Sequence, residues 1–374
     1  MKWRMFICAI CFLIGGCSLN IPLEDQFSDP DAITDVLSAR SLLASAYKAM
    51  PQQIFQLSVL SDDFCPSQHL NKDMSLQGLY NWREVEMTEL AGTLWAGYYA
   101  VIAEVNALLA RIDAVVTLDE TEKLEKMRIV CEAKALKSWC YFDLLRLFAP
   151  RYEGNENKDG IILKKRVELD FLPRSSVKEC VTEIRTLLNE ARNVDNTQKN
   201  VYWLSDKAVA YLQVELELYA GNYPAVLELT KDLETEYPES VLGADVYKYL
   251  WSSENSDARI FGKYQLEQIY MDIRFDTFEK GDYLVLSQNV DYEEEDIRKE
   301  WSEIPFVMPD AKNVRLLGKY NKMNSDKVAS KYVNVARAAG MWLMRVEALA
   351  RSGKEGDAVA LANRMLKQRG ATEW

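Results

Sequence analysis

Histidine is almost absent from this chain of 374 residues, which contains only His69. One imidazole excludes most histidine-based catalysis and most zinc sites, because these commonly need several histidine or cysteine side chains. Basic charge is also scarce, since 45 Lys and Arg residues face 57 Asp and Glu residues and the net charge is −12. An acidic chain repels the phosphate backbone, so nucleic acid is not an expected partner.

Sequence motifs of common enzyme classes are missing as well. The chain contains no nucleophile elbow, phosphate-binding loop or dinucleotide-binding fingerprint. A glycosidase needs only two carboxylates about 5–10 Å apart, and Asp62, Asp63 or the run 293–296 could supply them. Adjacent acids repel each other and are usually solvated, and the spacing of the run matches no EF-hand for calcium. We therefore predict no catalytic residue, no metal and no cofactor, with an enzyme or a calcium site as the alternatives.

The N-terminus lacks a hydrophobic run long enough to span a membrane. Residues 5–14 are apolar and follow Lys2 and Arg4, but a spanning helix needs about 20 such residues. The layout fits a secretory signal instead. The next residues, LIGGC at 13–17, resemble a bacterial lipobox, in which the cysteine becomes the first mature residue and carries acyl chains that anchor it to a membrane.

We accordingly predict a signal peptide at 1–16 and a tether at 17–30 that begins with lipidated Cys17. A plain secreted protein and an uncleaved N-terminal anchor are the alternatives. Four cysteines remain after the tether begins, and none forms a CxxC pair. Cys131 and Cys140 lie nine residues apart in one expected helix, about 13 Å, which is too far for a disulfide. We expect buried free thiols at these four positions, which are Cys65, Cys131, Cys140 and Cys180.

Helical periodicity dominates the remaining sequence. Apolar residues between Trp95 and Ile112 recur every three or four positions, which predicts an amphipathic helix. Another helix is predicted over 120–148, and Pro150 ends it. Several of these helices form antiparallel pairs that resemble tetratricopeptide (TPR) hairpins, which bury their apolar faces against neighbours. The other predicted helices cover 31–50, 176–193, 205–220, 223–237, 337–352 and 355–368.

Two segments break this periodicity. Residues 61–94 are predicted to be a long connection with little regular structure. Residues 239–333 mix short alternating runs, such as Ile260–Tyr264, with the acidic run 291–296. The predicted fold is therefore one mostly α domain over 31–374, built from TPR-like helix pairs, in which the two irregular segments form the ligand face.

Specific motifs resemble the SusD/RagB family of Bacteroidetes outer-membrane lipoproteins. The sequence W-x3-Y-x2-I-x3-N at 95–106 is followed by EAKALKSWCYFDLLRLF at 132–148, close to the family's E-A-x-x-L-R-A-x-x-Y-F-D-L-V-x-x-F-G. Lys137 and Ala149 depart from that pattern, and family members usually continue beyond the last helix pair, so a compact or C-terminally shortened member is expected. Later landmarks follow in the family's order at 172–177, 207–223, 296–298, 319–320 and 345–370.

The resemblance implies a binding protein of the outer membrane, lipid-anchored and exposed at the cell surface. It implies that the chain captures a nutrient, most simply an oligosaccharide, and delivers it to a SusC-like TonB-dependent transporter. A peptide ligand is one alternative, and a protein-interaction scaffold without ligand is another, since helical repeats often present a surface to a partner protein.

Aromatic and acidic residues in the two irregular segments are the candidate ligand contacts. Aromatic faces stack on the C–H face of a pyranose, and polar groups fix its hydroxyls. Aromatic residues at helical spacing are instead expected to pack in the core, namely Trp95, Trp139, Tyr141, Tyr219 and Trp342. The predicted ligand-binding residues are Asp62, Asp63, Trp82, Arg83, Trp251, Tyr270 and Trp301.

Overall fold

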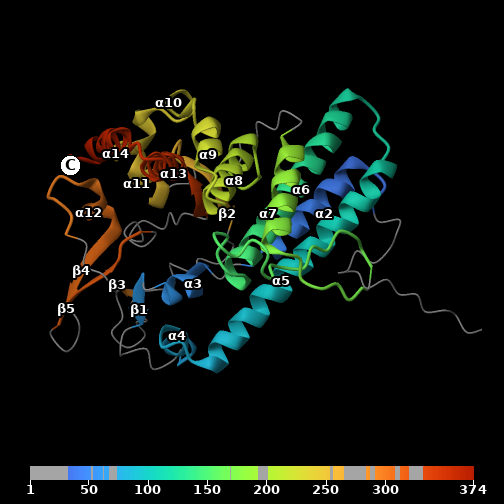
Figure 1. The fold of residues 1–374 in the computed structure, drawn as a ribbon, viewed down its shortest axis with the longest axis horizontal. Helices are drawn as coiled ribbons and strands as arrows, with labels where there is room; N and C mark the ends of the chain where they lie inside the picture. Colours follow the sequence, from blue (N-terminus) through green and yellow to red (C-terminus); the bar gives the residue numbers. More distant parts are fainter. Residues whose placement is uncertain are drawn as a thin grey trace, which may run out of the picture.

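The architecture was established with a computed structural model. It describes residues 33–51, 54–61, 63–66, 74–168, 170–192, 201–252, 256–264, 284–286, 291–307, 312–319 and 332–374. Within these ranges the chain is mostly helical, and the few strands are short (Figure 1).

Nine helices form the body of the molecule, in two groups that follow each other along the chain. In the first group, α6 packs against α2, α5 and α7, and in the second, α13 packs against α8, α9 and α14 (Figure 1). Helices α7 and α8 join the two groups. Successive helices thus cover one another's apolar faces, which confirms the predicted TPR-like arrangement. The first group comprises α2 (Val36–Ala49), α5 (Glu84–Arg111), α6 (Glu120–Phe148) and α7 (Val177–Ala191), and the second α8 (Asp206–Tyr219), α9 (Tyr223–Leu229), α10 (Leu233–Glu236), α13 (Ala338–Arg351) and α14 (Glu355–Arg369).

Helix ends follow the capping residues of the sequence. Asp119 accepts a hydrogen bond from the backbone N–H of Glu122 and starts α6 at the predicted residue. Ser176 and Glu179 form a reciprocal capping box at the start of α7. The prediction of one continuous helix over 223–237 was wrong, because the segment forms two helices, α9 and α10. The break lies next to Thr230, whose hydroxyl donates a hydrogen bond to the Val226 carbonyl at 2.7 Å.

Helix α5 corrects the prediction for residues 61–94. It begins at Glu84, eleven residues before the predicted start, and a further helix, α4 (Met74–Tyr80), precedes it. Glu84 and Glu86 lie in the first turn of α5, where negative charge is favourable. The segment therefore contains more regular structure than its sequence pattern indicated.

The two segments that break the helical periodicity meet in one sheet. Strand β1 (Phe64–Pro66) pairs antiparallel with β3 (Leu284–Leu286), and the sheet continues through β5 (Asn313–Leu317) to β4 (Glu303–Val307). Its neighbours include α3 (Ile54–Leu60), α4 and α12 (Ile297–Ser302). A second antiparallel pair joins β2 (Arg259–Tyr264) to β6 (Tyr332–Arg337), and α11 (Ala244–Ser252) precedes β2. The alternating run predicted at 260–264 is therefore confirmed as part of a strand.

One large apolar core runs through both groups of helices. Trp139, Tyr141 and Trp342 are buried in it, and Trp95 and Tyr219 pack against it, as their helical spacing predicted. A smaller core joins α3 and α4 to the strands through Val59, Leu79, Leu317 and Val333. The predicted free thiols are confirmed for the three cysteines whose side chains are described, Cys131, Cys140 and Cys180, all of which are buried.

Lys137 carries an expected pH dependence of stability. Its Nζ donates to Asn106 Oδ1 at 2.6 Å, and burial lowers the pKa of this lysine to about 8. Between about pH 8 and pH 10 the unfolded chain therefore binds more protons than the folded protein, and the free energy of unfolding should rise with pH. In Lys137→Met this rise should be smaller in urea unfolding measured at pH 7.5, 8.5 and 9.5. The exposed control Lys178→Met should keep the wild-type slope, and an unchanged slope in Lys137→Met would contradict the assignment.

Candidate functional site

Trp82 occupies a backbone position that usually requires glycine. It lies in the turn between α4 and α5 and has a φ of 54°, which makes it the one non-glycine residue of positive φ in the part of the chain that the structure describes. The Trp82 N–H donates to the Leu79 carbonyl at 3.0 Å, and the Arg83 N–H donates to the Gly78 carbonyl at 2.9 Å. These two bonds define a Schellman motif with Trp82 at the left-handed position.

Three other helices in the described part of the chain end with the same pair of bonds. Helices α8, α13 and α14 place Gly221, Gly353 and Gly370 at the left-handed position, with φ between 69° and 74°. A non-glycine residue there costs roughly 1–2 kcal/mol. Trp82 is nevertheless 62% exposed. Strain at an exposed aromatic residue is typical of a functional position, because packing does not explain it.

Arg83 lies next to this turn and is half exposed. Its guanidinium forms an ion pair with Glu86, and both side chains lie over Gly78. A side chain at residue 78 would collide with this pair. Trp82 and Arg83 therefore belong to one compact surface turn, as their adjacency in the sequence suggested, and the contact of either residue with ligand stays a prediction.

Asp63 lies on the neighbouring element, immediately before β1. Its backbone N–H donates to the Ser58 carbonyl at 3.2 Å, and the residue is exposed. Its negative charge raises the pKa of the nearby Lys319, which follows β5. Since α4 packs against α3 and β1, Asp63 and Trp82 belong to the same end of the molecule (Figure 1). Asp62 and Tyr270 lie outside the described residues.

The structure corrects the expected exposure of Trp251 and Trp301. Both were predicted to lie in irregular segments, but Trp251 is on α11 and Trp301 is on α12, and they are only 5% and 8% exposed. They share a small core with Tyr247 and Leu250. The spacing of 247, 250 and 251 places three apolar side chains on one helix face, a signal hidden by the irregular sequence around it. Their burial argues against direct stacking of either indole on a ligand.

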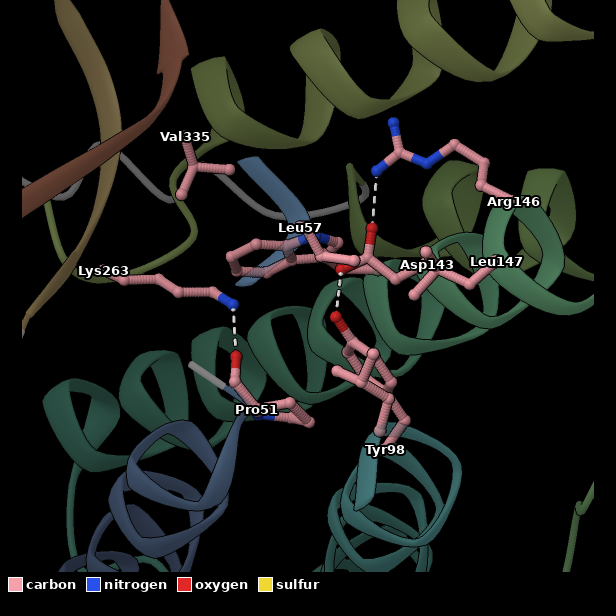
Figure 2. Close-up of a pocket in the computed structure, with 10 residues that line it drawn as sticks. Pro51, Leu57, Tyr98, Asp143, Arg146, Leu147, Lys263 and Val335 are labelled. Atoms are coloured by element: carbon pink, nitrogen blue, oxygen red, sulfur yellow. Dashed lines mark hydrogen bonds and ion pairs between the residues drawn. The ribbon is translucent and has the colours of Figure 1, made fainter. Parts of the chain in front are cut away.

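A cavity of about 270 Å³ lies where α5 and α6 approach β2 (Figure 2). Its lining is mainly apolar, and Trp139 and Tyr98 contribute their rings. A second cavity of about 240 Å³ shares Trp139, Arg146 and Val335 with the first. Volumes of this size suit a small molecule or one sugar ring rather than a chain.

Three charged side chains line the first cavity, namely Lys263, Asp143 and Arg146. Lys263 Nζ donates to the Pro51 carbonyl at 2.8 Å and lies 4.9 Å from the centre of the Trp139 ring. Asp143 accepts a hydrogen bond from the Tyr98 hydroxyl at 2.9 Å and pairs with Arg146 (Figure 2). Burial lowers the pKa of Lys263, whereas the nearby Asp143 charge raises it. The ammonium has three protons, so it can also donate to an acceptor that enters the cavity.

This cavity was not predicted from the sequence. Trp139 was correctly assigned to packing, and Asp143 and Arg146 appeared only as part of the family motif. Lys263 is one charged residue in a short strand, and it lies close to Asp143 only in the folded chain, because 119 residues separate the two in the sequence. No local pattern indicates such a meeting.

Structural contacts account for most of the acidic run. Glu293 accepts hydrogen bonds from the backbone N–H and hydroxyl of Thr372, at 2.7 and 2.8 Å. Glu294 pairs with Lys299, and Asp296 caps α12 while it pairs with Arg298. In the described ranges, no three His, Cys, Asp or Glu side chains gather as a metal site.

Comparisons with known proteins agree with this architecture. A family model named SusD-like, described as starch-binding and associating with the outer membrane, matches residues 23–214. No curated protein sequence matches the chain.

Solved structures of Bacteroides proteins share the fold over most of the chain. A SusD superfamily protein from Bacteroides vulgatus has a TM-score of 0.73 and 18% identity, and the match covers 90% of this chain and 81% of that one. A SusD-like carbohydrate-binding protein from the same species has a TM-score of 0.68, 16% identity and coverages of 91% and 77%. A SusD homologue from Bacteroides thetaiotaomicron has a TM-score of 0.66, 19% identity and coverages of 92% and 84%.

Proposed function

This chain belongs to the SusD-like family, whose model matches just over half of it, and we propose on that premise that it binds an oligosaccharide at the surface bearing Trp82. We further propose that it binds without chemical conversion, associates with the outer membrane through lipidated Cys17 and delivers its ligand to a TonB-dependent transporter. A peptide ligand would use the same surface and remains the alternative.

The observation that carries the proposed binding surface is the strained, exposed Trp82. Three comparable helix ends use glycine, so the fold itself has no need of an indole there. A large exposed ring on a fixed backbone can stack on the apolar face of a pyranose with little loss of conformational freedom. Asp63 and Arg83 supply charged groups for hydroxyl hydrogen bonds on the same end of the molecule.

Trp82→Gly is the sharpest test of this surface, because its two expected effects have opposite signs. Glycine relieves the positive φ, so the free energy of unfolding should stay unchanged or rise by up to about 1 kcal/mol. Loss of the ring should weaken binding of the best oligosaccharide on a glycan array by about 10- to 100-fold. Urea unfolding and titration calorimetry measure the two effects.

Trp374→Ala is the matched control, since it also removes an exposed indole, one that is 85% exposed. It should leave affinity within about twofold of wild type, because a scattered exposed aromatic residue ordinarily has no role. Unchanged affinity in Trp82→Gly would refute the proposed surface. A loss of stability above about 2 kcal/mol would instead assign the ring to packing.

The membrane anchor has a separate test. Labelled fatty acid should be incorporated into the wild-type protein and not into Cys17→Ala, because acylation needs the thiol. Cys180→Ala removes another thiol and should still be labelled. Co-purification of the labelled protein with a TonB-dependent barrel from native membranes would support the proposed partner, and label in Cys17→Ala would contradict the anchor.

A further inference from the structure

Three basic side chains gather around Trp251 and Tyr247, where α11, β6 and the end of α14 meet. We name Lys319, Arg337 and Arg369 the cationic cluster, and we propose that it binds the carboxylate or sulfate group of an acidic sugar. This inference rests on the proposed function and specifies the ligand class as an anionic rather than a neutral oligosaccharide.

Aromatic contacts fix the geometry of the cationic cluster. The Lys319 ammonium lies 5.0 Å from the centre of the Trp251 ring, and the Arg337 guanidinium lies 5.5 Å from it. The Arg369 guanidinium lies 4.3 Å from the centre of the Tyr247 ring, which is itself 5.7 Å from the Trp251 ring. Three positive charges from distant parts of the chain therefore lie next to one edge-to-face pair of rings, whose planes are inclined by 72°.

Arg369 is buried without the partners that a buried charge needs. It is only 7% exposed, and its Nη1 has no hydrogen-bond acceptor. Across the ranges that the structure describes, none of the three cluster residues has a carboxylate within ion-pair distance, whereas Arg364 pairs with both Glu234 and Glu239. Buried charges in proteins are ordinarily paired, because desolvation is otherwise costly.

Neighbouring acids do not neutralise the cationic cluster. The charge of Asp63 raises the pKa of Lys319 and that of Asp296 raises the pKa of Arg369, but Asp296 already accepts hydrogen bonds from both Nε and Nη2 of Arg298. Burial, together with the charge of Arg337, lowers the pKa of Lys319 to about 8 and that of Arg369 to about 10. The surroundings thus disfavour the charged forms, although both groups stay protonated at neutral pH. An anion from outside would remove this cost.

The shape of the cationic cluster suits a carboxylate or sulfate. Arginine presents a planar fork that binds these groups through two hydrogen bonds. Lys319 and Arg337 are partly exposed, so an anion can reach them from solvent, and the charge of Arg337 is close enough to act on the buried Arg369. Asp63, which lies near Lys319, is a predicted ligand residue at the end of the molecule that carries Trp82. An acidic oligosaccharide could therefore engage the proposed surface and the cationic cluster together.

The experiment compares paired ligands that differ only in charge. A galacturonate hexasaccharide and its methyl ester are titrated by calorimetry, next to the other acidic and neutral pairs on a glycan array. Hexaglutamate supplies the same charge on a peptide. In a separate arm, inorganic sulfate is added at constant ionic strength and the shift in Tm is measured. The variants are Arg369→Met and Lys319→Met, with the exposed Lys367→Met as the control on the same helix.

For whichever pair of ligands binds, we expect the acidic sugar to bind about tenfold more tightly than the neutral sugar, both to the wild type and to Lys367→Met. In Arg369→Met and Lys319→Met the preference should fall below about twofold. Sulfate should raise the Tm of the wild type and of Lys367→Met, and not the Tm of these two variants. Equal binding of neutral and acidic sugars would overturn the inference and leave the proposed function standing. Tighter binding of hexaglutamate than of any acidic sugar would overturn the sugar assignment. Absence of all glycan binding would overturn both.

Discussion

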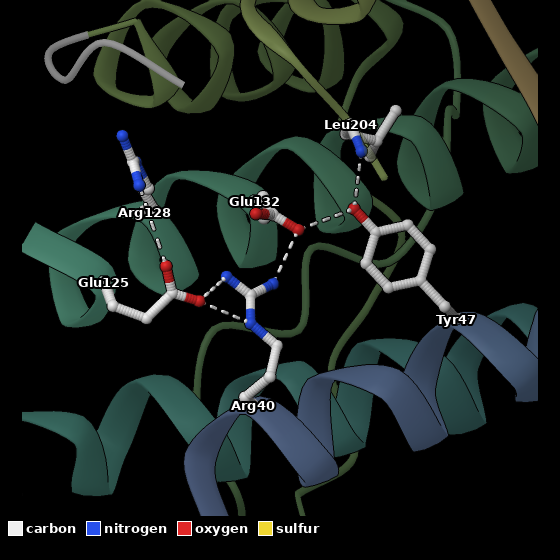
Figure 3. Close-up of polar contacts among 6 residues, drawn as sticks. All are labelled: Arg40, Tyr47, Glu125, Arg128, Glu132 and Leu204. Atoms are coloured by element: carbon white, nitrogen blue, oxygen red, sulfur yellow. Dashed lines mark hydrogen bonds and ion pairs between the residues drawn. The ribbon is translucent and has the colours of Figure 1, made fainter. Parts of the chain in front are cut away.

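Replacing Glu132 by alanine is expected to lower the free energy of unfolding by about 3–5 kcal/mol. The Glu132 side chain is fully buried in α6 and accepts a hydrogen bond from Arg40 Nη1 of α2 at 2.9 Å (Figure 3). The Tyr47 hydroxyl lies 3.5 Å from the same carboxylate and accepts the N–H of Leu204. Removal of Glu132 leaves the Arg40 guanidinium in the interior with one of its two carboxylates, and the tyrosine loses a partner.

Glu125 provides the control for this prediction. It pairs with the same guanidinium, but its side chain is 33% exposed, so Glu125→Ala should cost at most about 1 kcal/mol. Urea unfolding with an unchanged m-value measures both losses. The double variant Arg40→Met/Glu132→Met should recover most of the lost stability, because it leaves no charge unpaired. Equal losses in Glu132→Ala and Glu125→Ala would contradict the role assigned to the buried carboxylate.

Trp342→Ala should be comparably destabilising, by about 3–5 kcal/mol. The ring is fully buried in α13, its Nε1 donates to the Tyr237 carbonyl at 3.0 Å, and the Arg364 guanidinium lies 5.3 Å from its centre. Alanine leaves a cavity between α13 and the segment after α10 and removes the donor from a buried carbonyl. Thermal and urea unfolding should both show the loss.

Leu343→Ala is the control for Trp342→Ala, because it changes helix propensity at the adjacent position without removing a buried side chain. Leu343 is 55% exposed on the same helix, so Leu343→Ala should change the free energy of unfolding by no more than about 0.5 kcal/mol. Trp342→Phe keeps most of the apolar volume and loses the hydrogen bond, and its loss should lie between those of the two alanine variants. A Trp342→Ala loss below about 1 kcal/mol would show that the core collapses around the site.

Local patterns in the sequence predicted the helices well and the ligand surface only in part. The limits of α6 were correct because Asp119 and Pro150 act within one turn of the helix ends. The start of α5 was wrong because the apolar spacing before Trp95 is interrupted by polar residues, and the packing of α4 and the strands stabilises that first part of the helix. Tertiary contacts, which a local pattern does not contain, decide such boundaries.

Predicted site residues divide in the same way. Trp82 was singled out because it lies outside a helical period, and the structure places it in an exposed turn. Trp251 and Trp301 met the same criterion and are buried, since pairing of β2 with β6 and docking of α12 create a core that no local window contains. The cationic cluster joins residues 319, 337 and 369, and Lys263 meets Asp143 across the helical body. Contacts between residues so far apart in the sequence are determined by the topology of the fold.

The Schellman turn at Trp82 also has a genetic consequence. Tryptophan has the single codon TGG, and one base change converts it to GGG, which encodes glycine. Glycine, the residue that best fits the left-handed position, therefore requires only one base change, and random mutation would readily produce it. If Trp82→Gly folds as well as expected, growth on the bound glycan should select for the tryptophan codon, and prolonged growth without that glycan should allow glycine to replace it.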